Sequence, residues 1–458
     1  MSSGDPVPSL PHSAPARLPG LNRWALLGIY IALGLSPIVL ATLQGLPARN
    51  LWRELSSGLV MVGFAMMLVQ FLLSGRFSHV SGKVGIDLTM RFHQLIAWTI
   101  LAFMLAHPFL YVMPRLLSPD PSAAVASLQR MFGSQGLRTG VVAWWLLILL
   151  IPLAVFRDRL PFRYEIWRLS HGLGAAAIAA LGLHHTLRAG TYSADPVLAG
   201  FWVALGGVAL LSLVHVYGLK PILQKRRPYR VTSNRPVADR IWEVVVEPVD
   251  GAAITFAPGQ FVWLNLGHSP FSVTEHPFSI SSAPGERPRI SFTIKESGDF
   301  TDGIGSVPIG TRAYVDGPHG NFTLREAPGY VFIVGGVGLA PVMGLLRQLQ
   351  SEAFAGPLQL VYGNRIESQI LYREELDAMT KALDLRVDHV LSEPPEGWPG
   401  LVGQLSAGVL RECLGPSIHA DRLYFVCGPL AMMDSVERTL VDLGVPADRI
   451  VSERFKYD

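Results

Sequence analysis

Residues 92–113 read FHQLIAWTILAFMLAHPFLYVM, an apolar run with a histidine near each end. Its length is close to the ~20 residues that a helix needs to cross a bilayer core. Ionisable side chains at membrane depth are costly and tend to mark function. His93 and His107 are 14 positions apart, which puts both on one helix face, roughly 21 Å apart along the axis. One histidine would therefore lie in each leaflet.

Five further apolar runs flank this segment, so the first half of the chain predicts a six-helix transmembrane bundle over residues 21–220. The chain has 458 residues, of which 50% are hydrophobic and only 16% charged, which is too apolar for an ordinary soluble enzyme. The other runs cover residues 24–43, 57–74, 141–156, 166–187 and 197–219.

The charged residues and cysteines narrow the class of protein further. Lys and Arg concentrate after the second, fourth and sixth runs, which favours a multi-pass protein of the cell (inner) membrane with both termini in the cytoplasm. Because the basic residues sit beside apolar runs, they give no nucleic-acid signal. The only cysteines, Cys413 and Cys427, lie in the polar half, so neither a disulfide framework nor a cysteine-ligated metal is indicated. Residues 1–20, rich in Pro and Ser, are predicted to be a disordered cytoplasmic tail.

The fifth run carries a second set of histidines, His171, His184 and His185. In a six-span bundle the third and fifth helices run in the same direction, so His93 lies level with His171, and His107 with His184 or His185. Two pairs of neutral imidazoles at two depths would supply both axial ligands to two haem irons. Helix geometry favours His185 over His184. The 13 positions from His171 to His184 end roughly 140° short of four full turns of an ideal helix, so these two side chains would point to different faces. The alternative is that these histidines only link helices by hydrogen bonds.

After residue 220 the pattern changes to that of two soluble domains. Short runs rich in Val, Ile and Phe, such as residues 241–246 and 261–266, alternate with Gly and Pro turns and predict an antiparallel β-barrel over residues 226–325. From residue 330 strand-like and helical runs alternate, which predicts an α/β domain with a parallel sheet over residues 328–458.

The predicted barrel contains a candidate flavin site. The motif His276-Pro277-Phe278-Ser279 offers an aromatic face and a hydroxyl donor, as a flat ring with a hydrogen-bonding edge requires. The charge, backbone amides and hydroxyl that could meet a pyrophosphate come from Lys295, Gly298 and Thr301. A plain barrel turn is the alternative.

The predicted α/β domain contains a candidate nicotinamide-nucleotide site. A strand leads into the turn Gly335-Gly336-Val337-Gly338-Leu339-Ala340-Pro341, whose amides could approach a dinucleotide phosphate, although Pro341 replaces the last glycine of the usual pattern. Arg365 follows the next strand and could meet the 2′-phosphate of NADPH, with NADH as the alternative. Cys427 and Gly428 would bring a small, soft side chain and a permissive backbone to the carboxyl edge of the sheet.

These motifs and their order resemble the ferredoxin-NADP reductase superfamily joined to a ferric-reductase-like transmembrane domain, as in NADPH oxidases and ferric-chelate reductases. HPFS is similar to the HPFT-type FAD motif of the oxidases, GGVGLAP to their nicotinamide loop, and CGP to the stretch that flanks the nicotinamide. In that family the fifth-span ligands are commonly thirteen positions apart, so the resemblance selects His184 over His185. It also implies that Phe455 stacks on the flavin.

The resemblance implies an oxidoreductase that takes electrons from NADPH through FAD and two haems b to an acceptor across the membrane, either O2 or a ferric chelate. A quinone or a periplasmic partner protein is an alternative acceptor. In a different class, the chain would be a transporter or sensor without haem, whose histidines relay protons.

Overall fold

The computed structural model describes residues 20–454 except 75–76, 78–79, 81, 121, 161–162, 416–417 and 419–420. Apart from Gly20, the predicted tail lies outside the described residues, and so does Phe455. The described chain divides into two compact units, of which the first ends at Ile222 and the second begins at Leu223.

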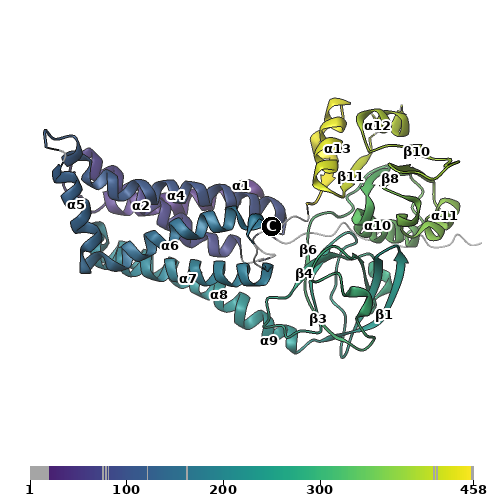
Figure 1. Cartoon of the computed structure of the whole chain (residues 1–458), viewed down its shortest axis with the longest axis horizontal. Coiled ribbons are helices and arrows are strands. Elements are labelled where there is room, and N and C mark those ends of the chain that lie inside the picture. Colours follow the sequence, from purple (N-terminus) through teal and green to yellow (C-terminus); the bar gives the residue numbers. More distant parts are fainter. Residues whose placement is uncertain are drawn as a thin grey trace, which may run out of the picture. The chain divides into compact units, whose positions relative to one another are not determined.

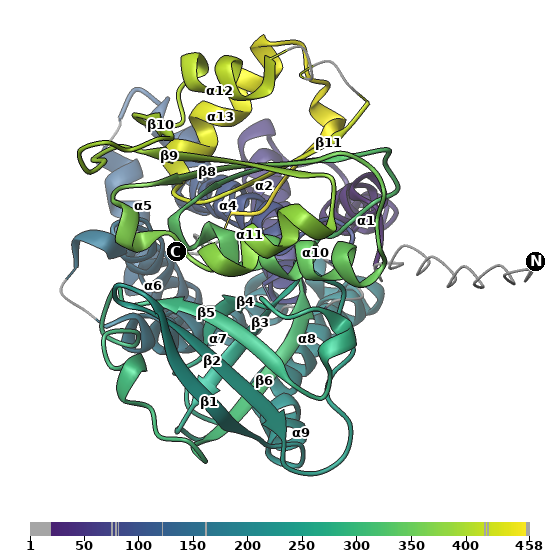
Figure 2. The same cartoon turned by 90° about the vertical axis from the view of Figure 1, so that its right-hand side faces the viewer.

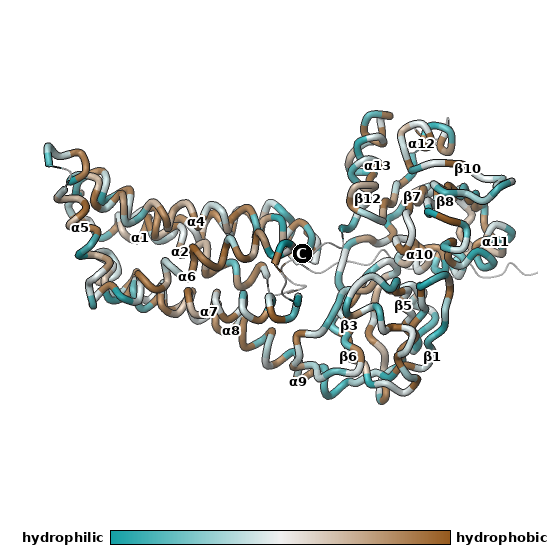
Figure 3. The backbone as a smooth tube through the Cα atoms, in the orientation of Figure 1, coloured by the Kyte–Doolittle hydropathy of each residue, from teal (hydrophilic) through white to brown (hydrophobic). Residues whose placement is uncertain are grey.

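The first unit is a bundle of long apolar helices (Figure 1). Within the described residues six helices are long and apolar enough to cross a membrane, and large apolar side chains within them, such as Leu95 and Leu211, stay 64% and 68% exposed, as lipid-facing positions allow. The hydrophobic colouring runs along most of each helix (Figure 3). The six predicted spans are therefore confirmed. Their bounds are α1, Arg23–Thr42; α2, Leu51–Leu73; α4, Ile86–Leu116; α6, Arg138–Val155; α7, Tyr164–Ala189; and α8, Pro196–Val214.

The sixth span is less regular than the predicted single helix over residues 197–219. After α8 a π-helical turn, His215–Leu219, leads into the short α9, Lys220–Lys225. Pro221 has no N–H, and in an α-helix its ring would clash with the carbonyl of residue 217, so a widened turn relieves the conflict. The end of the bundle from which α9 departs is called the near end below. The far end holds the loops before α2, α6 and α8 and a short helix α5, Ser122–Gly133.

The second unit begins with the predicted antiparallel barrel. Its strand order is β4-β3-β6-β1-β2-β5, and a bridge between Ile280 and Phe292 joins the segment after β4 to β5, so that the sheet closes on itself. Alternating buried side chains fill the interior. The strands are β1, Tyr229–Ala238; β2, Ile241–Pro248; β3, Phe261–Leu266; β4, His276–Ser279; β5, Ile290–Lys295; and β6, Arg312–His319.

The rest of the unit is the predicted parallel-sheet domain, with strand order β10-β9-β8-β7-β11-β12. Helices α10 and α11 cover the sheet face toward the barrel, and α12 and α13 cover the other face (Figure 2). The strands are β7, Tyr330–Gly335; β8, Leu358–Asn364; β9, Leu385–Leu391; β10, Leu401–Val402; β11, Leu423–Cys427; and β12, Ile450–Ser452, and the helices are α10, Leu339–Ser351; α11, Arg373–Ala382; α12, Ala407–Leu414; and α13, Leu430–Asp442.

A buried polar network fixes the barrel against the parallel-sheet domain. Arg347 of α10 donates to both carboxylate oxygens of Glu375 on α11, at 2.7 and 2.8 Å, and to the carbonyl oxygen of Ser281 in the barrel segment after β4. The Tyr372 hydroxyl donates to Glu243 of β2 at 2.9 Å. These bonds thus link the barrel to the parallel-sheet domain within the second unit.

Candidate functional site

The structure brings His93 of α4 and His171 of α7 together at the near end of the bundle, with ring centroids 6.4 Å apart. Two imidazoles that share one iron need ring centres about 6 Å apart, taking ~2 Å for each metal–nitrogen bond and ~1 Å from nitrogen to ring centre. The Nδ1 atom of His171 is buried without a hydrogen-bond partner in the part of the chain that the structure describes. The pair therefore fits the two axial positions of a haem, whose porphyrin supplies the other four nitrogens.

A chain of hydrogen bonds orients the His93 ring. The Gln70 amide donates through Nε2 to the Tyr30 hydroxyl at 3.0 Å, which leaves its Oε1 facing His93 Nδ1 at 2.9 Å. Tyr30 in turn donates to the carbonyl oxygen of Met66. Because Gln70 Oε1 can only accept, Nδ1 of His93 carries the proton and Nε2 keeps its lone pair for a metal.

An aromatic stack holds the His171 ring. The indole of Trp167, one turn earlier on α7, stacks on it at 5.4 Å with an angle of 24°. The guanidinium of Arg157 lies 4.6 Å from the Trp167 ring centre on the same stack. A cation, an indole and an imidazole are thus layered at the near end, and this restricts rotation of the His171 ring.

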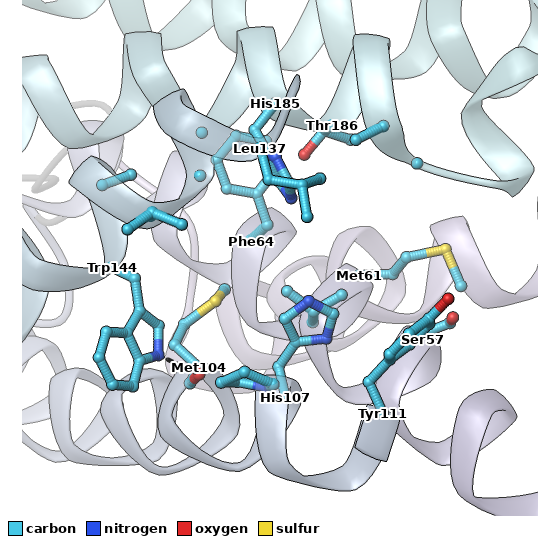
Figure 4. Close-up of a pocket in the computed structure, with 18 of the residues that line it drawn as sticks. Ser57, Met61, Phe64, Met104, His107, Tyr111, Leu137, Trp144, His185 and Thr186 are labelled. Atoms are coloured by element: carbon cyan, nitrogen blue, oxygen red, sulfur yellow. Dashed lines mark hydrogen bonds between the residues drawn. The ribbon is translucent and has the colours of Figure 1, made fainter. Parts of the chain in front are cut away.

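The far end encloses a cavity of about 350 Å³. His107 of α4 and His185 of α7 line it and point into it from opposite walls, beside Met61, Phe64 and Trp144 (Figure 4). Pro108 follows His107 and leaves the Met104 carbonyl without its helical donor, and the indole of Trp144 supplies one at 2.8 Å. The cavity wall is therefore a stable part of α4 despite the proline.

The His107 ring is oriented as the His93 ring is. The Ser56 hydroxyl donates to the His107 carbonyl at 2.9 Å, so its oxygen accepts from His107 Nδ1 at 2.8 Å. Nε2 again remains available to a metal. Across the cavity, Nδ1 of His185 is buried without a hydrogen-bond partner among the described residues. This second imidazole pair also suits a haem.

The structure places His185 on the cavity wall, whereas the family resemblance selected His184. His184 is exposed, does not line the cavity, and contacts Thr139 Oγ1 through Nδ1 at 3.1 Å. His185 packs so closely on α6 that a Cβ at Gly140 would stand 2.5 Å from its Nδ1. Only glycine leaves room for this approach. α7 keeps an even helical path, so the 14-residue spacing from His171 holds on this helix as it does on α4.

The flavin motif forms β4 in full, and Phe278 is paired with Val262 of β3. The ring of Phe300, from the loop after β5, stacks on His276 at 4.2 Å and lies 6.1 Å from Phe278. Sequence reasoning missed Phe300, because nothing in the loop predicts that it folds back onto β4. The loop and β4 together form an aromatic wall suited to a flat ring.

The predicted pyrophosphate residues lie where β5 ends. Lys295 is the last residue of β5 and is exposed. The amide of Gly298 donates to Asp302 Oδ1 at 3.2 Å, and the Thr301 hydroxyl accepts from the Ser297 amide at 2.8 Å. These internal bonds hold the loop in shape, so a pyrophosphate would have to share or replace them.

The glycine turn and the cysteine loop meet at the carboxyl edge of the parallel sheet. Neighbouring strands β7 and β11 end there, and their connections leave in opposite directions, which makes this the topological switch point. A Cβ at Gly338 would stand 2.5 Å from the Cys427 carbonyl oxygen, and one at Gly428 would stand 3.0 Å from the Gly335 nitrogen. Gly336 has φ +54°, and a Cβ added there would meet no heavy atom within 4 Å. Pro341 is buried in the first turn of α10. The turn is a backbone cradle of the kind a dinucleotide needs.

Cys427 is buried beside Glu453, which sequence reasoning did not single out. Burial, together with the nearby Glu453 charge, raises the pKa of the Cys427 thiol well above its usual range. A thiol that stays protonated is a packing group rather than a nucleophile. Glu453 is itself only 3% exposed; it follows β12 and reaches the edge through tertiary packing alone. Arg365 lies exposed just past β8, on the same edge of the sheet.

Comparison with known proteins matches three family descriptions in chain order. Residues 59–182 match the ferric reductase like transmembrane component, residues 239–321 an FAD-binding domain and residues 332–438 an oxidoreductase NAD-binding domain. These matches agree with the helical bundle, the barrel and the parallel-sheet domain respectively.

Among relatives, ferredoxin–NADP reductase B of Sorangium cellulosum is 32% identical over 238 residues, which are 49% of this chain and 96% of that protein. The reductase component of propane 2-monooxygenase from Mycolicibacterium goodii is 29% identical over 49% of this chain and 66% of its own length. Among solved structures, the ferredoxin reductase in carbazole 1,9a-dioxygenase covers 50% of this chain and 69% of its own, with 23% identity and a TM-score of 0.44. By its match to the Sorangium reductase and to the three family descriptions, the chain belongs to the ferredoxin–NADP reductase family, here following a ferric reductase-like transmembrane component, and it is an NAD(P)H-dependent membrane oxidoreductase with an FAD-binding domain.

Proposed function

We propose that the chain moves electrons from cytoplasmic NADPH, or NADH, through FAD and two b-type haems to an acceptor at the far end of the bundle. The acceptor is ferric iron or O2, which would yield Fe(II) or superoxide. The observation that carries the proposal is the presence of two opposed imidazole pairs at two depths of one apolar bundle. A hydrocarbon layer cannot carry a free electron, so a relay needs one centre near each face.

In this proposal the near haem is held by His93 and His171, and the far haem by His107 and His185. Gln70 and Ser56 keep the proton of the α4 histidines on Nδ1, which presents Nε2 to the iron. When bound, FAD and the two haems would supply the one-electron chemistry that divides the two-electron donation of NAD(P)H into single-electron steps.

In the second unit the same proposal gives each motif a task. The β4 motif, with His276, Pro277, Phe278 and Ser279, holds the flavin ring, and Lys295, Gly298 and Thr301 hold its pyrophosphate. Gly335, Gly336, Gly338 and Pro341 shape the nucleotide cradle, Arg365 meets a 2′-phosphate, and Cys427 and Gly428 flank the nicotinamide. Phe455 would cover the flavin. The domain limits 21–220, 226–325 and 328–458, and the placement of both termini in the cytoplasm, are part of the proposal.

The first test is spectroscopic. Purified protein should be red, with a reduced-minus-oxidised spectrum of haem b and about two haems per FAD. Colourless, folded protein would refute the haem proposal. The remaining hypothesis would then be that the chain is a nucleotide-binding sensor or transporter.

The second test measures transfer across the membrane. Protein in sealed liposomes should oxidise external NADPH when an acceptor is enclosed, and not when the lumen holds buffer alone. Superoxide-dismutase-sensitive dye reduction identifies O2 as acceptor, and trapping of Fe(II) by ferrozine identifies ferric iron. If only a quinone or a carrier protein supports turnover, the proposed acceptors are wrong.

A further inference from the structure

The far end of the bundle carries an excess of arginine. Its segments, residues 43–56, 111–140 and 186–197, contain six arginines, no lysine and three carboxylates. The arginines are Arg49, Arg53, Arg115, Arg130, Arg138 and Arg188. Short loops on the translocated side of a membrane protein usually hold few such residues, because positive charge there opposes insertion. The arginines at this end are therefore expected to have a function.

The carboxylates of these segments are committed to local contacts. Glu54 pairs with Arg49 at 2.9 Å and accepts from the Tyr192 hydroxyl. Asp120 accepts from the amide of Ser122 at the start of α5, and Asp195 caps the first turn of α8. Arg49 is therefore the arginine whose charge is neutralised in place.

Four of the other arginines form what we call the arginine rim: Arg53, Arg115, Arg138 and Arg188. Arg115, Arg138 and Arg188 are exposed, and none of the four has an ion pair with any residue that the structure describes. Arg53 lies 5.2 Å from the Tyr111 ring centre, and its buried Nε has no hydrogen-bond partner within the same described residues.

None of the four rim arginines lines the cavity of the second histidine pair, but each lies beside a residue that does. The cavity reaches the far-end loops, where Arg49, Tyr111, Leu137 and Ala189 line it. Arg138 and Arg188 are next in sequence to Leu137 and Ala189, Arg115 is about one turn beyond Tyr111, and Arg53 stacks on the Tyr111 ring. The positive charge thus lies next to the far-end lining of this cavity.

We propose that the arginine rim recruits anionic acceptors, specifically ferric complexes of polycarboxylates with a net negative charge, in preference to neutral or cationic ones. Uncompensated charge beside a site raises the local concentration of oppositely charged reactants and their association rate. This inference rests on the proposed function and names the substrate class of its far-end site. In balance, one NAD(P)H and two Fe(III) complexes give NAD(P)+, one proton and two Fe(II) complexes, with no bond to the chelator formed or broken.

The test compares acceptors of opposite charge enclosed in sealed liposomes of neutral lipid, with external NADPH and an ionophore that prevents charge build-up. The probes are the trianion ferricyanide and the trication hexaammineruthenium(III), followed by ferric citrate. The variant is Arg138→Gln with Arg188→Gln, and the control is Arg411→Gln, which removes an exposed arginine from α12. NADPH-driven haem reduction without acceptor and without oxygen is recorded separately.

The unmodified protein should prefer ferricyanide. The double variant should lose about fivefold in kcat/KM for ferricyanide, mainly through KM, and gain about as much for the ruthenium complex. Both effects should shrink at ~0.5 M salt, and Arg411→Gln should behave like the unmodified protein. Ferric citrate should follow ferricyanide.

Two outcomes distinguish failure of the rim proposal from failure of the proposed function. Normal haem reduction with the same acceptor preference in the unmodified protein and the double variant overturns the rim proposal alone, and would assign these arginines to lipid headgroups. Failure of NADPH to reduce haem in the unmodified protein overturns the proposed function and this inference with it.

Discussion

The adjacent residues His184 and His185 offer a matched pair of substitutions. His185→Ala removes a cavity-lining imidazole that faces His107, whereas His184→Ala removes an exposed ring whose hydrogen bond, within the part of the chain that the structure describes, is to Thr139. The two changes are alike in composition, position along the chain and helix propensity. A difference between them reports which side chain holds the far haem.

The expected magnitudes follow from the two separate imidazole pairs. His185→Ala leaves the 6.4 Å pair of His93 and His171 intact, so haem content should fall from about two to about one per FAD. Transfer to a far-end acceptor should fall by more than roughly 100-fold, because loss of a ligand costs at least as much as loss of its supporting partner. His184→Ala loses one exposed hydrogen bond, worth about 1 kcal/mol or less, and should keep both haems.

The assay is the pyridine haemochrome content normalised to FAD, with the rate of NADPH-driven flavin reduction as a check on the reductase unit. Flavin reduction should be unchanged in both variants. Loss of one haem in His184→Ala with retention of both in His185→Ala would refute the assignment drawn from the cavity. Retention of two haems in both variants would refute the histidine pairing at the far end.

Three further outcomes concern the reductase unit. Arg347→Ala should lower the free energy of unfolding by about 2–4 kcal/mol, since it leaves the buried carboxylate of Glu243 and the partly exposed one of Glu375 without their cation, while Arg373→Ala at an exposed ion pair should cost under about 1 kcal/mol. Urea unfolding followed by FAD release measures both, and equal midpoints would contradict the proposed network. Gly338→Ala should raise KM for NAD(P)H on the order of 10- to 100-fold, because its Cβ would meet the Cys427 carbonyl at 2.5 Å. An unchanged KM in steady-state kinetics would refute the proposal that this turn binds the nucleotide. Arg365→Ser should lower kcat/KM for NADPH roughly tenfold and leave kcat/KM for NADH unchanged. If the ratio of these two values did not change, another residue would be responsible for selecting between NADPH and NADH.

Much of the architecture was predictable because it depends on local patterns. Apolar runs of membrane-spanning length predicted the six helices, and Val- and Ile-rich runs between Gly and Pro turns predicted both sheets. The glycine turn after β7 was predictable from its place between a strand and a helix, since only that setting brings amides to a helix N-terminus. Its meeting with Cys427 followed from the rule that parallel strands end at one edge.

The sequence by itself thus determined the membrane bundle, the two reductase domains and the presence of histidines near both ends of two helices, because these features are read directly from residue patterns along the chain. Only the tertiary structure placed His185 on the cavity wall and left His184 exposed, since this depends on how α7 packs against Gly140 of α6. It alone identified Gln70, Ser56 and Glu453, which are remote in sequence from the residues they face. Periodicity specifies which face of a helix is apolar, whereas the partner across that face is decided by the packing of other helices.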